Sequence, residues 1–201
     1  MTCLSAAARA CLRRWLALTN GATALFLALP FLPPLLLRQG RADLAGLIYD
    51  AYHLTCHEWP FRAYFLFGPQ ATYSLAELQA AGVEAVYDFR GSPELGYKVA
   101  FCARNVAIYA AVLLAGLLYA RLRPRLPALS FLGYLALITP MALDGITQLF
   151  GWRESTWELR TLTGLLFGFA SVWLIYPRLD RTVAELLAPR PRRATAPGHA
   201  A

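Results

Sequence analysis

The residues best suited to chemistry lie between positions 53 and 57, in the sequence His53-Leu-Thr-Cys56-His57. This stretch holds two imidazoles and a thiol in a chain that has only three His and four Cys. Imidazoles and thiols bind zinc, and they also serve in proton transfer and redox chemistry. The stretch therefore predicts one wall of a polar site.

A metal is the first ligand to consider for this wall. Cys56, His57 and Cys102 are soft or borderline ligands, and His53 or Asp144 can complete a set of four. Such a set suits zinc better than magnesium or calcium. We expect a zinc-type site with Cys56, His57, Cys102 and His53 as its candidate ligands.

Two other hypotheses fit this part of the molecule. A disulfide between Cys56 and Cys102 would form on an oxidising side of a membrane and would leave His57 as a hydrogen-bonding residue. The protein would then serve as an accessory subunit of a larger membrane complex. In the other interpretation, four arginines would surround an anionic lipid headgroup: Arg62, Arg104, Arg153 and Arg160. In that case the general acid or base would be His57 or Asp144, with the side-chain amides of Gln70 and Gln148 orienting the phosphoester.

The composition indicates that a membrane positions these residues. The 201 residues are 58% hydrophobic and only 15% charged, and the mean hydropathy is +0.44. The net charge is +7, but the basic residues lie between apolar runs and do not form one exposed face, so we expect no nucleic acid partner. The expected partners are the lipid bilayer and further membrane subunits.

Four apolar segments reach the roughly 17 to 25 residues that cross a bilayer, and they cover residues 16–37, 99–120, 128–150 and 161–177. We expect an all-α membrane protein in which these segments form a four-transmembrane-helix bundle. Three prolines, Pro30, Pro33 and Pro34, should kink or unwind the end of the first span. Gly164 and Gly168 have the spacing that lets a neighbouring helix approach the fourth span closely.

The arginines predict the topology by the positive-inside rule. Eleven of them precede the first span, follow the fourth or lie between the second and third, which places both termini in the cytoplasm. Residues 38–98 then form a structured extracytoplasmic loop. A capping box from Ser74 to Glu77 predicts a short helix there, ended by Gly82. We expect a single membrane domain over residues 1–188 and a disordered cytoplasmic tail over 189–201.

Polar residues of two spans fall at one depth near the extracytoplasmic side. Arg104 lies about 7 Å from the start of the second span and Asp144 about 9 Å from the end of the third, at 1.5 Å per residue. Charged residues at such depths face the bundle interior and pair with one another, so we predict a contact between Arg104 and Asp144. The pair can serve as structure or as part of a catalytic site.

Several short motifs occur in a characteristic order: Cys56-His57 with Arg62, Cys102-Ala-Arg104, Asp144-Gly-Ile-Thr147-Gln148, Arg153-Glu-Ser155, and Arg160 before Thr163-Gly164. Over residues 50 to 175 this order resembles the polytopic membrane family known as domain of unknown function 2085. Family members commonly carry a second Cys where this chain has Asn105. The resemblance implies a membrane protein and these site residues, with no assigned reaction.

Overall fold

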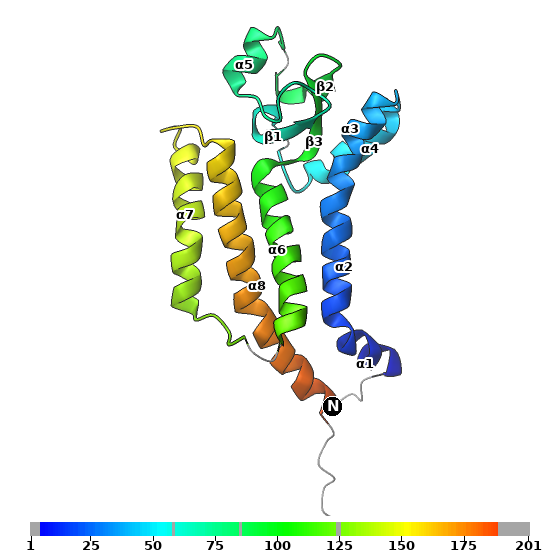
Figure 1. Cartoon of the computed structure of the whole chain (residues 1–201), viewed down its shortest axis with the longest axis vertical. Coiled ribbons are helices and arrows are strands. Elements are labelled where there is room, and N and C mark those ends of the chain that lie inside the picture. The colour runs from blue at the N-terminus through cyan, green and yellow to red at the C-terminus, as the bar shows by residue number, and fades with distance from the viewer. Residues whose placement is uncertain (1–4, 58, 85, 124–125, 189–201) are drawn as a thin grey trace, which may run out of the picture.

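The structure is a computed structural model that describes residues 5–57, 59–84, 86–123 and 126–188. It is mostly helical (Figure 1). Three helical segments are long and apolar enough to cross a membrane, as expected of a multi-pass membrane protein: Trp15–Arg38, Ala103–Leu122 and Trp157–Leu187. The tail over residues 189–201, predicted to be disordered, lies outside the described residues.

The prolines interrupt the first apolar segment, as predicted. After α1 (Ala6–Arg13), the segment consists of α2 (Trp15–Ala28), the 3-10 turn η1 (Leu29–Phe31) and α3 (Leu32–Arg38). Proline has no amide hydrogen to donate and its ring clashes with the preceding turn, so a regular helix cannot run through this region. The prolines themselves, Pro30, Pro33 and Pro34, are all buried.

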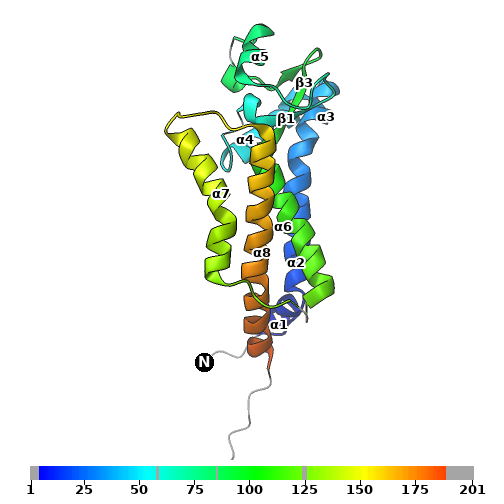
Figure 2. The same ribbon diagram turned by 60° about the vertical axis from the view of Figure 1, so that its left-hand side comes forward.

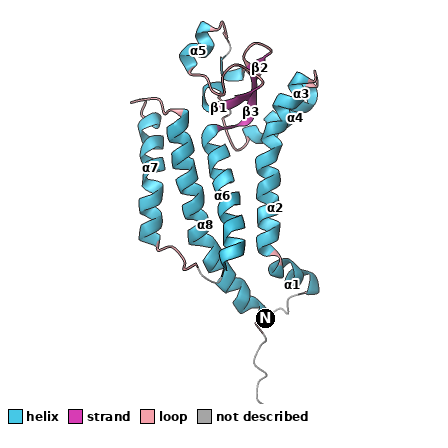
Figure 3. Cartoon of the chain, viewed as in Figure 1, coloured by secondary structure: helices cyan, strands magenta, loops and turns pink. Residues whose placement is uncertain are grey.

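Between the first and second spans lies a compact unit of helices and strands, which we call the head (residues 42–102). Its elements are α4 (Ala42–His53), η2 (Pro60–Arg62), β1 (Ala63–Leu66), α5 (Leu75–Ala80), η3 (Val86–Asp88), β2 (Gly91–Ser92) and β3 (Gly96–Cys102). The strands form an antiparallel sheet in the order β1-β3-β2 (Figure 3). The prediction of an all-α protein was therefore wrong for this segment.

The short helix α5 begins and ends as its sequence predicts. The Ser74 hydroxyl accepts from the Glu77 amide, and the Glu77 carboxylate accepts from the Ser74 amide. After the helix, Gly82 adopts a φ of 81°, a conformation that side chains with a Cβ rarely take.

The second span begins later than predicted. Val99, Ala100 and Phe101 are fully buried in β3, and helix α6 runs only from Ala103 to Leu122. A short apolar run fits a buried strand as well as a helix, so hydropathy alone misplaces this boundary. Cys102 is consequently the residue at the strand-to-helix junction.

An aromatic cluster fixes the head on the helices. Phe101 of β3 stacks on Tyr109 of α6 with ring centroids 5.6 Å apart, and its edge meets Phe26 of α2 at 5.4 Å. Tyr49 and Tyr52 of α4 complete this buried cluster. Because it joins four elements, the position of the strand-to-helix junction is tightly constrained.

The long helices form a row and not a closed bundle. Helix α7 (Phe131–Leu149) packs against α8 (Trp157–Leu187), α8 packs against α6, and α6 packs against α2 (Figures 1 and 2). Helix α8 continues past its predicted end at Pro177. Helix α7 is not among the three segments apolar enough to span, since it carries Asp144 and Gln148, so a four-helix bundle is not confirmed.

Small residues bring α6 and α8 together, as the glycine spacing predicted. A Cβ on Gly168 would lie 2.5 Å from the Ile108 carbonyl oxygen and 2.7 Å from the Ala111 Cβ. A Cβ on Gly164 would lie 2.8 Å from the Arg104 carbonyl oxygen. Contacts this close exclude larger side chains, and van der Waals packing between helices then contributes to association in a membrane.

We therefore expect Gly168→Val to destabilise the folded protein by about 1 to 3 kcal/mol, because the added methyl groups meet the backbone of α6. The measurement is thermal unfolding of the protein in detergent. Gly21→Ala is the matched control, since nothing lies within 4 Å of a Cβ at Gly21 on α2. Equal melting temperatures for the two variants would contradict close packing of α6 on α8.

Candidate functional site

A buried carboxylate connects three parts of the chain where the helices meet the head. The side chain of Asp144, in the last turns of α7, is only 1% exposed. One carboxylate oxygen accepts from Arg104 in the first turn of α6 and from the Ser155 hydroxyl at 2.9 Å, and the other accepts from Arg153. The predicted contact between Arg104 and Asp144 is thus confirmed.

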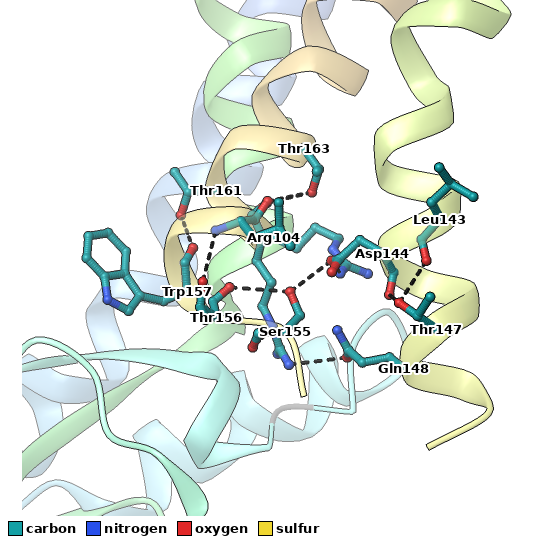
Figure 4. A network of polar contacts seen from close by, with 12 residues as sticks. Arg104, Leu143, Asp144, Thr147, Gln148, Ser155, Thr156, Trp157, Thr161 and Thr163 are labelled. Carbon is teal, nitrogen blue, oxygen red and sulfur yellow. Dashed lines mark hydrogen bonds and ion pairs between the residues drawn. The ribbon is translucent and has the colours of Figure 1, made fainter. Parts of the chain in front are cut away.

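Figure 4 shows this network with α7 on one side and the start of α8 on the other. Gln148 lies one turn after Asp144, and its carbonyl accepts from Arg160 at 3.2 Å. Arg160 in turn donates through Nε to the Ser155 carbonyl at 3.2 Å. With both carboxylate oxygens engaged, Asp144 is placed to hold Arg104.

Next to this network is a cavity of about 170 Å³ at the junction of the head and the helices. Seven of the predicted site residues line it: Cys56, His57, Arg62, Cys102, Arg104, Gln148 and Arg160. They come from the loop after α4, from η2, and from the ends of α6, α7 and α8. His53 is not part of this wall, since it lies exposed at the end of α4.

Three nitrogen atoms at this cavity are buried and have no hydrogen-bond partner among the described residues: Arg62 Nε, Arg104 Nε and Gln148 Nε2. All three are donors. The guanidinium of Arg62 also lies over the Trp59 ring at 4.2 Å, and burial lowers the pKa of Arg62. Because an unmade hydrogen bond of a buried donor is costly, the wall is suited to a ligand rich in acceptors.

The two thiols meet at the same cavity. The side chains of Cys56 and Cys102 are in hydrogen-bond contact and are not joined by a disulfide. The contact with Cys56 lowers the pKa of Cys102 to about 6, against the effect of burial, and the backbone N–H of Asn105 and the charges of Arg160 and Arg104 act in the same direction. The start of helix α6 and two arginines therefore favour a thiolate at Cys102.

The expected metal set is incomplete in this geometry. Among the described residues, no group of three or more His, Cys, Asp and Glu side chains lies close enough to hold a metal ion. His53 does not line the cavity, and Asp144 is enclosed by its arginine and serine partners. Cys56, His57 and Cys102 remain the only members of the expected set that line the cavity.

Two further residues of the site had no stated role in the sequence analysis. Trp59 supports the Arg62 guanidinium, and Ser155 donates to Asp144. The signal for Ser155 was its place in the motif Arg153-Glu-Ser155, whereas nothing in the sequence distinguished Trp59 from an interfacial aromatic residue.

We expect alkylation of Cys102 by iodoacetamide to rise with pH around 6, because the lowered pKa populates the thiolate there, whereas an ordinary thiol reacts near pH 8.5. Peptide mass spectrometry of a Cys3→Ser, Cys11→Ser protein separates the Cys102 peptide from the peptide of the one other thiol, Cys56. Cys56→Ala should move the midpoint upward, since it removes the largest cause of the shift. A midpoint above pH 8 in the parent protein would contradict the geometry at Cys102.

The comparisons with known proteins agree with a membrane protein. The family model described as "Predicted membrane protein (DUF2085)" matches residues 94–174, which include Cys102, Arg104, Asp144 and Arg160. The uncharacterized protein MJ1492 of Methanocaldococcus jannaschii is 35% identical over 134 residues, which cover 65% of this chain and 67% of that protein. No solved structure matches. The chain therefore belongs to the DUF2085 family of predicted membrane proteins.

Proposed function

We propose that this protein binds a phosphate-type oxyanion in the cavity between the head and the helices. Arg62, Arg160 and Gln148 act as the donors, and Arg104 is held in place by Asp144. In this proposal α7 crosses the membrane as a fourth span beside α8. The arginine-rich helix ends and both termini then lie in the cytoplasm, and the head lies on the extracytoplasmic side.

The observation that carries this proposal is a set of buried donors that have no hydrogen-bond partner within the part of the chain that the structure describes. Arg62 Nε, Arg104 Nε and Gln148 Nε2 line one cavity, and none of them is an acceptor. A tetrahedral oxyanion offers several acceptor oxygens and forms charge-assisted bonds with guanidinium groups. A cation would instead be repelled by the charges of Arg62, Arg104 and Arg160.

The cavity itself is too small for more than an anionic group. A second cavity of about 450 Å³ shares Arg62 and Arg160 with it and extends toward α5 and Trp157. This space suits the organic part of a phosphoester, such as a lipid headgroup. His57 lines the oxyanion cavity and is the candidate general acid or base for such a ligand.

A zinc-type metal is the second candidate, favoured by the contact between the Cys56 and Cys102 side chains and by His57 in the same wall. Three such ligands with an open position are typical of a catalytic zinc site, but these three would have to move closer together, since no group of three lies close enough among the described residues. Elemental analysis of purified protein separates the candidates. Stoichiometric zinc that is lost in Cys56→Ser would favour the metal.

The expected result for the oxyanion is saturable binding of inorganic phosphate or of dihexanoyl phosphatidic acid, measured by isothermal titration calorimetry in detergent. Preference for the lipid would identify a headgroup, and equal binding would identify a free solute. Arg62→Gln should weaken binding about ten- to hundredfold, because it removes a buried charged donor.

Arg90→Gln provides the matched control for this experiment. It removes the same charge from the head, but Arg90 is exposed and pairs with Asp50 outside the cavity. The proposal would be overturned if neither inorganic phosphate nor dihexanoyl phosphatidic acid binds. It would also be overturned if Arg62→Gln and Arg90→Gln lose the same binding affinity.

A further inference from the structure

Another cavity, distinct from the two described above, has a polar end and lies on the opposite half of the molecule. It has a volume of about 690 Å³ and lies between α2 and α6, where α1 joins α2. Figure 1 shows this junction at the end of α2 farthest from the head. It is separate from the oxyanion cavity and shares no residue with it.

Small and apolar residues form most of this groove. Its α2 side includes Ala17, Gly21 and Ala24, and its α6 side includes Leu113 and Leu117. Nothing lies within 4 Å of a Cβ at Gly21, so the groove is open at this point. Both sides belong to candidate membrane spans, so in a bilayer the groove faces lipid.

One end of the groove is positively charged. Arg13, Arg14 and Arg123 line it. Arg123 pairs with Asp180, but within the described part of the chain neither Arg13 nor Arg14 makes an ion pair. Arg13 and Arg14, which make no ion pair within the described residues, thus lie at the end of an apolar groove. This arrangement suits a phosphate headgroup that carries an acyl chain.

A buried polar atom marks the boundary between these two parts. Asn20 is 8% exposed and lines the groove, while its Oδ1 is buried against Gly116 of α6 and has no hydrogen-bond partner among the described residues. It lies about 9 Å along the helix from Arg14, at 1.5 Å per residue. This is the depth at which polar glycerol and ester groups follow a headgroup phosphate, before the acyl chains begin.

We propose that this groove is a binding site for one anionic phospholipid, whose phosphate contacts Arg13 and Arg14 and whose acyl chain lies over Gly21. The site requires the negative charge of the lipid. A zwitterionic lipid adds a cation next to the two arginines and binds more weakly.

The test is native mass spectrometry of delipidated protein, titrated with phosphatidylglycerol or with phosphatidylcholine. Wild-type protein should retain one phosphatidylglycerol in preference to phosphatidylcholine. Arg13→Gln with Arg14→Gln should weaken phosphatidylglycerol binding about tenfold, since each basic residue near a headgroup contributes to its attraction. Gly21→Phe should abolish retention of the lipid, because the ring fills the groove.

Each variant has a matched control that leaves the groove unchanged. Arg9→Gln removes a charge from the exposed surface of α1, and Leu18→Phe adds a ring at an exposed position of α2 outside the groove. Equal losses in Arg9→Gln and in the double variant Arg13→Gln with Arg14→Gln would show bulk adsorption only and would overturn the proposal. Unchanged retention in a folded Gly21→Phe protein, or equal binding of the two lipids, would overturn the proposal.

Discussion

The buried carboxylate of Asp144 determines how the helix ends assemble where they meet the head. Its side chain is 1% exposed, and removing a carboxylate from water costs several kcal/mol unless close partners compensate. Arg104, Arg153 and Ser155 supply that compensation from α6, from the loop after α7 and from the residues before α8. Since α7 otherwise packs at the edge of the row, this interaction links it to α6 and orients Arg104.

The cavity beside Asp144 follows from that arrangement. Asp144 holds Arg104 through one terminal nitrogen of its guanidinium, and its Nε has no partner among the described residues. Arg160 is held through the Ser155 carbonyl and through Gln148. The aromatic cluster around Phe101 fixes Cys102 at the start of α6 and brings the Cys56 loop against it. Positive charge and donors therefore accumulate where head and helices meet, which is the physical basis for proposing an anionic ligand.

Much of the site could be predicted because depth in a membrane follows directly from position along a helix. Matching depths predicted that Arg104 meets Asp144, and the glycine spacing predicted the close approach at Gly168. Rotation about the helix axis was harder to predict. Had α6 continued through Cys102, that residue and Arg104 would point about 200° apart. The structure removes this conflict, because Cys102 ends a strand and the helix begins only at Ala103.

The remaining differences have equally specific causes. The strands of the head are short, and Val99 to Phe101 look apolar whether they belong to a buried strand or to a span. His53 was grouped with Cys56 by spacing alone, but helix α4 ends at His53 and the chain then turns, which leaves His53 exposed. The polar side chains Asp144 and Gln148 reduce the hydropathy of α7, so composition does not confirm the span predicted over residues 128–150.

The most direct test of the central role of Asp144 compares two substitutions of the same chemistry, Asp144→Asn and Asp50→Asn, by equilibrium unfolding in mixed micelles. Each removes a carboxylate that pairs with arginine, but the Asp50 side chain is 73% exposed. Our account predicts a loss of about 3 to 5 kcal/mol for Asp144→Asn, because two arginines lose their buried partner, and less than about 1 kcal/mol for Asp50→Asn. Equal losses in the two variants would contradict it.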